Sequence, residues 1–318
     1  MSDLRFNVEL TPPDISPYRA GNTGVDYVTT FAAGEPGPHV AVLGLTHGNE
    51  ICGAIAIDRL FQAGIRPRRG KLTLGFNNVA AYLEFDARYP VASRYIDEDF
   101  NRLWSPATLD GPRRSAELER ARAMRPIVDA ADYLLDLHSM QYATAPLMLA
   151  GTLDKSRELA RNVGIPEIVM CDPGHAAGPR MRDYGGFGDP ASLKNALLVE
   201  CGQHWERSSE RVAWQTTWRY LRHLDVVDRA TADNEIEPAA APQKLIRVTQ
   251  AVIASSPSFR FAKTFTGLEI IPRQGDVIAW DGEEAVRAPY DNCVLIMPVP
   301  NNVKTGLTAV RLGRLETA

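Results

Sequence analysis

The stretch that decides the fold is VAVLGLTHGNE, residues 40–50, which an Ala/Ile-rich segment follows. The apolar run 40–45 predicts a buried parallel strand, and residues 50–63 predict a helix. His47 and Glu50 lie three residues apart at the turn between them. An imidazole nitrogen and a carboxylate oxygen at this spacing suit Zn²⁺. A catalytic zinc site also needs a third protein ligand and an open position for water.

The composition is that of an ordinary globular protein. The chain has 318 residues, of which 45% are hydrophobic and 23% charged, enough for one large core and a smaller domain. A net charge of -4 without a basic cluster gives no support for a nucleic-acid or membrane partner. Residues 1–5 lack the order of a signal peptide, and no apolar run approaches the roughly 20 residues of a membrane span. Four dispersed cysteines form no CxxC, so we expect no disulfide framework and a cytoplasmic location.

Strand-like and helix-like segments alternate along the first part of the chain. After a lead-in to about residue 38, strands are expected at 40–45, 71–76, 133–137 and 196–199, and helices at 50–63, 106–131 and 155–163. This alternation predicts an α/β domain with a largely parallel sheet.

The pattern changes near residue 229. The segment 229–243 is polar and then rich in Pro and Ala, which predicts a linker. Beyond it, short strands are expected at 244–253, 259–265, 276–279 and 294–299. We therefore expect two domains, a catalytic α/β domain over residues 1–238 and a small all-β domain over residues 244–318.

Three of the predicted strands end beside a chemically useful side chain. His47 follows one strand, His138 follows another in Asp-Leu-His-Ser, and Glu200 follows a third. Because sites in α/β sheets lie at the carboxyl ends of parallel strands, these side chains are expected to converge. We predict that His47, Glu50 and His138 bind one zinc ion. The alternative for the first pair is a helix cap and a solvated acid in the first helical turn.

Glu200 is the predicted general base. A carboxylate after an apolar strand is costly to bury unless it has a partner or a task. Beside a metal-bound water it can accept a proton and later deliver it to a leaving amine. The alternative is a salt-bridged acid at a strand terminus. His204, close behind, is expected on an exposed loop, and the alternative is that it lines the pocket.

The loop 94–102, RYIDEDFNR, is dense in charge. Arginine holds carboxylates bidentately, and a nearby amide adds a neutral donor. Asn101 and Arg102 are therefore predicted to anchor a substrate carboxylate, and Arg94 to face the oxyanion formed on attack. Taken alone, the segment also fits a solvated loop.

Together these segments resemble the aspartoacylase/succinylglutamate desuccinylase family, a branch of the zinc-carboxypeptidase-like hydrolases. The matching stretches are residues 44–50, 94–102, 136–139 and 199–202, in the family's order. The resemblance implies a mixed, largely parallel sheet with helices on both faces and an appended β domain. It also implies that one Zn²⁺ per chain supports hydrolysis of an N-acyl amino acid or a related small carboxylate-bearing amide.

The resemblance also implies roles for individual residues. Arg94 would polarise the scissile carbonyl, Glu200 would be the general base, and Asn101 with Arg102 would hold the carboxylate. Asp99 would fix the tautomer of His47, as an acceptor behind a ligand imidazole usually does. Asp136 would serve His138 in a similar way.

The chain departs from the family pattern in its substrate-binding residues. Aspartoacylases carry a further substrate arginine between the third ligand and the catalytic Glu, and neither Arg180 nor Arg182 is matched to it. Tyr290 is predicted to line the pocket from the β domain, or alternatively to be a turn residue. The acyl group and the amine of the substrate stay open, and a homo-oligomer is compatible with the sequence.

Two rival functions are also compatible with these motifs. One is a zinc carboxypeptidase acting on short peptides, which a capping β domain disfavours because a narrow site excludes long chains. The other is a non-catalytic protein of the same fold that binds small carboxylates. A complete ligand set beside Glu200 argues against the second, since a pure binder has no need of a base.

Overall fold

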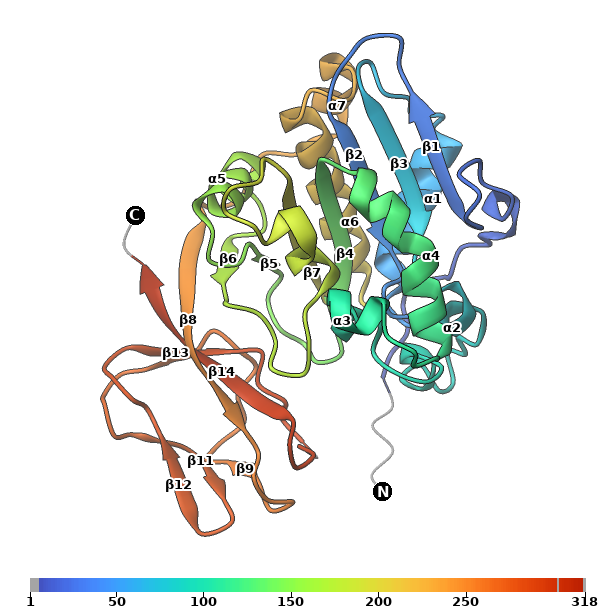
Figure 1. Ribbon diagram of the computed structural model, residues 1–318. Coiled ribbons are helices and arrows are strands. Elements are labelled where there is room, and N and C mark those ends of the chain that lie inside the picture. Colours follow the sequence, from blue (N-terminus) through green and yellow to red (C-terminus); the bar gives the residue numbers. More distant parts are fainter. Residues whose placement is uncertain (1–5, 302, 317–318) are drawn as a thin grey trace.

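The computed structural model describes residues 6–301 and 303–316 (Figure 1). The α-helices are α1 (Ile51–Gln62), α2 (Val79–Leu83), α3 (Pro106–Leu109), α4 (Ala116–Ala130), α5 (Asp154–Val163), α6 (Arg207–His223) and α7 (Arg229–Glu235). The strands are β1 (Val28–Ala32), β2 (His39–Gly44), β3 (Lys71–Phe76), β4 (Tyr133–Met140), β5 (Leu147–Leu149), β6 (Ile168–Cys171), β7 (Asn195–Gln203), β8 (Lys244–Ile253), β9 (Arg260–Phe261), β10 (Ile270–Ile271), β11 (Val277–Asp281), β12 (Glu284–Arg287), β13 (Cys293–Ile296) and β14 (Thr308–Glu316).

One 11-stranded mixed sheet organises the molecule, in the order β1-β3-β2-β4-β7-β5-β6-β8-β14-β13-β10. β2 pairs in parallel with β3 and β4, β4 with β7, β5 with β6, and β6 with β8. The other neighbours are antiparallel, as are those of the three-stranded sheet β12-β11-β9. The expectation of a largely parallel sheet is therefore wrong. One cause is the connection between β4 and β5, which is too short for the helical crossover that parallel strands require.

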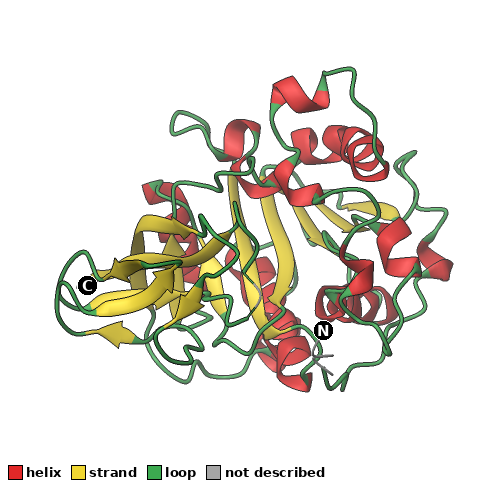
Figure 2. Cartoon of the chain, turned by 90° about the horizontal axis from the view of Figure 1, so that it is seen from below, coloured by secondary structure: helices red, strands yellow, loops and turns green. Residues whose placement is uncertain are grey.

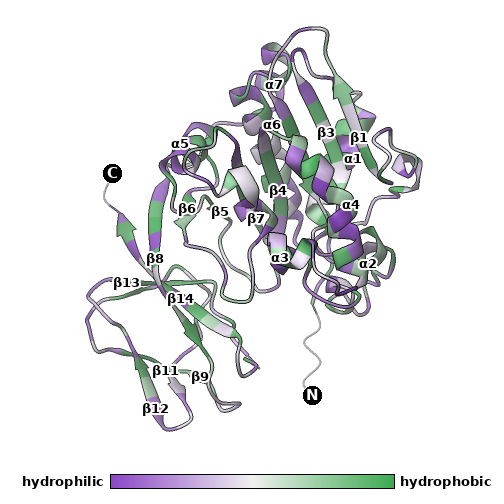
Figure 3. Cartoon of the chain, in the orientation of Figure 1, coloured by the Kyte–Doolittle hydropathy of each residue, from purple (hydrophilic) through white to green (hydrophobic). Residues whose placement is uncertain are grey.

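Helices cover both faces of the central strands, as Figure 2 shows. Alternate residues of β4 divide between the faces, because side chains alternate along a strand. Leu135 and Leu137 pack in a core with residues of α1, α5 and α6. Leu134 packs on the opposite face in a second core, with residues of α4. The central strands are mostly coloured hydrophobic in Figure 3, as burial on both faces requires.

The segment after residue 243 continues the large sheet. β8 pairs with β6, and β14 and β13 follow it outward (Figure 1). β10 pairs with β13 at the edge of the sheet. These strands also enclose a hydrophobic cluster of their own, which includes Phe259, Ile278 and Leu295. The division into domains near residue 240 stays a prediction.

The expected linker is wrong over its first half, because α7 forms at Arg229–Glu235. Asp228 caps this helix, with its side chain accepting a hydrogen bond from the backbone N–H of Thr231 at 2.8 Å. The predicted helix over 106–131 is interrupted, since α3 and α4 are separate. Over the described ranges, no helix has the length and apolar character that crossing a membrane requires.

Candidate active site

His47, Glu50 and His138 form a compact buried triad. The Nδ1 atom of His47 lies 2.7 Å from Glu50 Oε1, and Nδ1 of His138 lies 2.9 Å from Glu50 Oε2. One ligand atom from each residue lies within 4.8 Å of the others, close enough to surround a single ion. Two imidazole nitrogens and one carboxylate oxygen are a donor set that suits catalytic zinc. The predicted ligands therefore do meet in the fold.

The turn after β2 sets the position of this triad. Leu45 adopts φ 57°, a conformation that is rare for a residue with a branched side chain, and it redirects the chain before His47. Gly48 has no room for a side chain. A Cβ there would lie 2.4 Å from the backbone carbon of Ala81 and 2.5 Å from the backbone oxygen of Ser93. The glycine of the HGNE stretch is thus required by close backbone packing.

Acidic residues hold the outer nitrogen of each histidine. Asp99 Oδ1 lies 3.0 Å from His47 Nε2, and Asp136 Oδ2 lies 2.8 Å from His138 Nε2. Both Nδ1 atoms are therefore left to face Glu50, the arrangement that orients ligand imidazoles. Asp136 is itself fixed by the hydroxyl of Thr46, which donates to Oδ1 at 2.7 Å. The side-chain amide of Asn77 in turn donates to that hydroxyl at 2.8 Å.

The electrostatics of the triad favour a cation at its centre. Burial would raise the pKa of Glu50, but His47 and His138 hold it well below its usual range. Burial would lower the pKa of His138, but Asp136 and Glu50 hold it well above its usual range. Asp136 and Glu50 thus stabilise positive charge at His138, which a proton or a metal ion can supply. A metal requires the neutral imidazole, so its binding releases the proton.

Glu200 lies beside His138 on the neighbouring strand. The two are Cα partners in the parallel pairing of β4 with β7, so their side chains share one face of the sheet. Glu200 Oε2 is buried without a hydrogen-bond partner in the part of the chain that the structure describes. Burial raises the pKa of Glu200 to about 7, while His138 opposes the shift and Glu50 adds to it. A carboxyl that titrates near neutrality suits a general base.

The charged loop is held against the triad by Arg94. Its guanidinium lies 3.3 Å from Glu50 Oε1 and 3.1 Å from Asp99 Oδ2. Burial raises the pKa of Asp99, but His47, Arg94 and Arg102 hold it below its usual range. The two ends of the loop are therefore held against the triad, while Tyr95, Ile96 and Asp97 between them are exposed to solvent.

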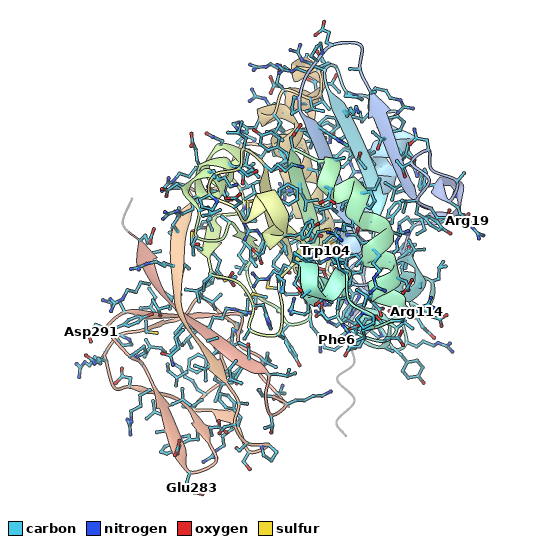
Figure 4. The ribbon with its side chains drawn as sticks, in the orientation of Figure 1. Phe6, Arg19, Trp104, Arg114, Glu283 and Asp291 are labelled. Carbon is cyan, nitrogen blue, oxygen red and sulfur yellow. The ribbon has the colours of Figure 1, made fainter. Side chains whose placement is uncertain are left out.

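Glu117 of α4 fixes the backbone of this loop. Its carboxylate is fully buried and accepts hydrogen bonds from the backbone N–H groups of Ile96, Asp97 and Glu98 at 2.6, 3.0 and 3.2 Å. The loop then leads into Trp104, labelled in Figure 4, which is buried against neighbouring aromatic rings. Sequence reasoning missed Glu117, because nothing in a helix pattern distinguishes this acid from a solvated one.

Asn101 and Arg102 also lie at the site. Asn101 is buried, with its Nδ2 atom 3.3 Å from His138 Nε2 and its Oδ1 accepting from the backbone N–H of Met181 at 2.7 Å. Arg102 NH2 lies 3.8 Å from Asp99 Oδ2. Burial and then nearby arginines lower the pKa of Arg102 to about 10, against the opposing effect of Asp99. A cation in this setting favours an added carboxylate.

Two further residues named from the sequence are His204 and Tyr290. His204 is buried, not exposed, and its Nδ1 is 2.8 Å from the Ser139 hydroxyl. Tyr290 lies in the C-terminal strands, where its hydroxyl pairs with Thr249 at 2.5 Å and Arg314 stacks on its ring. Among the described residues no hydrogen bond or ion pair joins Tyr290 to the triad, so its substrate role stays a prediction.

A comparison with known proteins identifies the family of the chain. Residues 36–204 match the family described as the succinylglutamate desuccinylase/aspartoacylase catalytic domain, just over half of the chain. The chain belongs to this family. The match contains all four motif stretches on which the resemblance was based.

Relatives of the family resemble the chain only in part at the sequence level. An N-acyl-aromatic-L-amino acid amidohydrolase of Rattus norvegicus is 32% identical over 120 residues, 35% of this chain and 36% of that protein. An aspartoacylase of Mus musculus is 29% identical over 121 residues, 35% of this chain and 37% of that protein. The chain thus matches little more than a third of the length of these curated relatives.

Solved structures resemble the chain over almost its full length. A succinylglutamate desuccinylase/aspartoacylase from Rhodobacter sphaeroides superposes with TM-score 0.67 at 17% identity, covering 92% of this chain and 90% of the other. A succinylglutamate desuccinylase from Vibrio parahaemolyticus gives TM-score 0.66 at 15% identity, covering 91% and 86%. At such low identity these similarities establish the fold alone.

Proposed function

We propose that the protein is a zinc-dependent deacylase that hydrolyses the amide bond of an N-acyl amino acid or a related small carboxylate-bearing amide. The observation that carries the proposal is the pairing of His138 with Glu200, which puts a carboxylate beside a His-Glu-His triad, with its Oε2 lacking a hydrogen-bond partner among the described residues. The amidohydrolase names of the curated relatives support the reaction class.

In this proposal His47, Glu50 and His138 hold one Zn²⁺. When bound, the ion lowers the pKa of a coordinated water and polarises the scissile carbonyl. The donor set fits, and the carboxylates of Asp99 and Asp136 are positioned to keep both imidazoles in the ligand tautomer.

The other residues act on protons and charge. Glu200 accepts the proton of the attacking water and later delivers it to the leaving amine nitrogen. Arg94 donates hydrogen bonds to the oxyanion that develops on the carbonyl. Asn101 and Arg102 hold the substrate carboxylate and so orient the amide. We expect a cytoplasmic enzyme without nucleic-acid or membrane partners, and its oligomeric state is left open.

The test is a panel of N-acetyl, N-succinyl and N-formyl amino acids, with short peptides for comparison, assayed on zinc-loaded protein. We expect hydrolysis of at least one N-acyl amino acid, a loss of several orders of magnitude in Glu200→Ala, and mainly a raised KM in Arg102→Ala. Near-full activity of Glu200→Ala rules out the assigned base. Cleavage of peptides alone favours the carboxypeptidase alternative, and binding without turnover favours the non-catalytic one.

A further inference from the structure

The two residues that follow β7 hold both segments that carry the proposed metal ligands. The strand contains Glu200, and the chain continues directly into His204 and Trp205. The indole N–H of Trp205 donates to the backbone oxygen of Asn49, in the HGNE stretch, at 3.1 Å. The backbone N–H of His204 donates to the backbone oxygen of Met140, at the end of β4, at 2.8 Å. The strand of the proposed base is thus tied to the triad at two further points.

The pairing of β4 with β7 is irregular beside the triad. His138 pairs with Glu200. The next pair is Met140 with Gln203, so β7 contains one residue more than β4 in this interval. Ser139 lies in the interval and has no Cα partner in the ladder. Irregularities of this kind redirect side chains and free backbone groups for other partners next to active sites.

Ser139 uses its backbone and its side chain for different partners. Its backbone N–H donates to Oε2 of Glu50 at 3.1 Å, the same oxygen that lies 2.9 Å from Nδ1 of His138. Its hydroxyl lies 2.8 Å from Nδ1 of His204, and within residues 6–301 and 303–316 this hydroxyl has no other hydrogen-bond partner. Both residues are buried, so bulk water cannot replace either one. Loss of the imidazole would therefore release the residue whose N–H holds Glu50.

The imidazole of His204 is costly where it lies. Its Nε2 atom is buried without a partner in the described part of the chain. Burial lowers the pKa of His204 to about 3, so the ring is neutral near pH 7. A neutral imidazole has one donor and one acceptor, and one of the two is left unsatisfied here. A phenyl ring would pack edge-on against Trp205, as the imidazole does at 5.1 Å, without this penalty, but it could not bind the Ser139 hydroxyl.

We propose that His204 is a positioning residue of the metal site. It holds Ser139 in place through the hydroxyl, and the backbone N–H of Ser139 then orients the carboxylate of Glu50 toward the two histidines. Because groups behind the ligands commonly set metal affinity, the effect of His204 is on the binding of the ion and not on the reacting atoms. This inference rests on the metal binding within the proposed deacylase function.

Substitutions of His204 separate hydrogen bonding from packing. Asn carries its polar atoms on Cγ, as His carries Nδ1, whereas Gln carries them one bond further out, as His carries Nε2. His204→Asn can therefore keep the hydrogen bond to Ser139, while His204→Gln and His204→Phe lose it. The control is His223→Phe, which makes the same change at an exposed histidine that ends α6.

The zinc affinity of each variant would be measured by competition with a chromogenic chelator, and thermal unfolding would confirm that each is folded. His204→Phe and His204→Gln should each lower zinc affinity about tenfold, as the loss of a group behind a metal ligand does. His204→Asn should stay within about threefold of wild type, and His223→Phe should match wild type. Equal losses in all three His204 variants, or no loss in His204→Phe, overturn the proposal.

A double-mutant cycle tests the route through Ser139. Ser139→Ala removes the hydroxyl and keeps the backbone N–H, and it should lower zinc affinity about tenfold. Adding His204→Phe should cost less than a further threefold or so, because the hydrogen bond is already lost. Independent losses that multiply to about a hundredfold overturn this route.

Hydrolysis by the wild type is measured separately from these affinities. Zinc binding without turnover of any N-acyl amino acid refutes the deacylase function, while the differences between the His204 variants still support the positioning role. Turnover with the same zinc affinity in all variants overturns the role of His204 alone. A wild type that binds no zinc overturns both.

Discussion

Replacing Glu200 by Gln should stabilise the metal-free protein at alkaline pH while it inactivates the enzyme. The carboxyl group lies in β7, and its Oε2 atom is buried without a partner in the described chain. Gln keeps nearly the same shape and cannot ionise. The structure therefore predicts that this substitution raises stability and lowers activity. The ionised Glu200 carboxylate is needed as the base, but burial makes it costly to keep charged in the folded protein.

The magnitude follows from the pKa of Glu200, which burial raises from 4.5 to about 7. In the folded protein the carboxyl keeps its proton up to about pH 7, whereas in the unfolded chain it releases it near pH 4.5. The folded state thus binds more protons in this window, and wild-type stability falls as pH rises through it. At about 1.4 kcal/mol per pKa unit, the ionised group costs at most about 3 kcal/mol above pH 7.

The assay is urea unfolding of chelator-treated wild type and Glu200→Gln at pH 5 and pH 8. The variant's advantage in the free energy of unfolding should be small at pH 5 and reach roughly 2–3 kcal/mol at pH 8. Glu158→Gln removes an exposed carboxylate from α5 and should change stability by less than about 0.5 kcal/mol. An advantage of equal size at both pH values, or none at pH 8, would refute the reasoning about burial.

Three further predictions concern the metal site. Chelation should abolish activity and added Zn²⁺ restore it, and metal analysis of His138→Ala should find well below one zinc per chain. Gly48→Ala should lower zinc affinity by more than about tenfold, because its Cβ would lie 2.4 Å from the backbone of Ala81, whereas Gly34→Ala, in open space, should have no effect in a competition assay with a chromogenic chelator. Asp136→Asn should weaken zinc binding by about 10- to 100-fold in the same assay, and unchanged affinity would mean that Asp136 does not orient His138.

The triad could be predicted from sequence because its signals are local. Each ligand stands at or just after an apolar run, and parallel strands bring their carboxyl ends together whatever the rest of the chain does. The predicted strands are too short at their carboxyl ends, because β4 continues to Met140 and β7 to Gln203, so His138 and Glu200 lie within their strands. This difference does not change the prediction that the two residues lie side by side, because the pairing of β4 with β7 matches them directly.

The supporting residues could not be predicted, because their roles depend on contacts between distant segments. Asn77 supports Asp136 through Thr46, and Glu117 anchors the loop 94–102 from a helix. In the sequence, a helical acid that will be buried looks the same as one that will be solvated, because only the fold shows which segment packs against it. The prediction of an exposed loop for His204 is wrong for the same reason, since His204 is buried and pairs with the hydroxyl of Ser139.

The pairing of β8 with β6 explains why the C-terminal segment continues the large sheet. A separate β domain would be expected to cap the sheet from outside, but β8 pairs directly with β6 and extends the sheet on which Glu200 lies. β14 pairs antiparallel with β8, with Arg311 opposite Ala251, and this register brings the arginine to Asp172 at the carboxyl end of β6. The carboxyl end of β6 points away from those of β4 and β7, because β6 is parallel to β5 and β5 is antiparallel to β7. Two ladders of backbone hydrogen bonds thus fix the C-terminal strands to the large sheet, although the sequence pattern changes near residue 229.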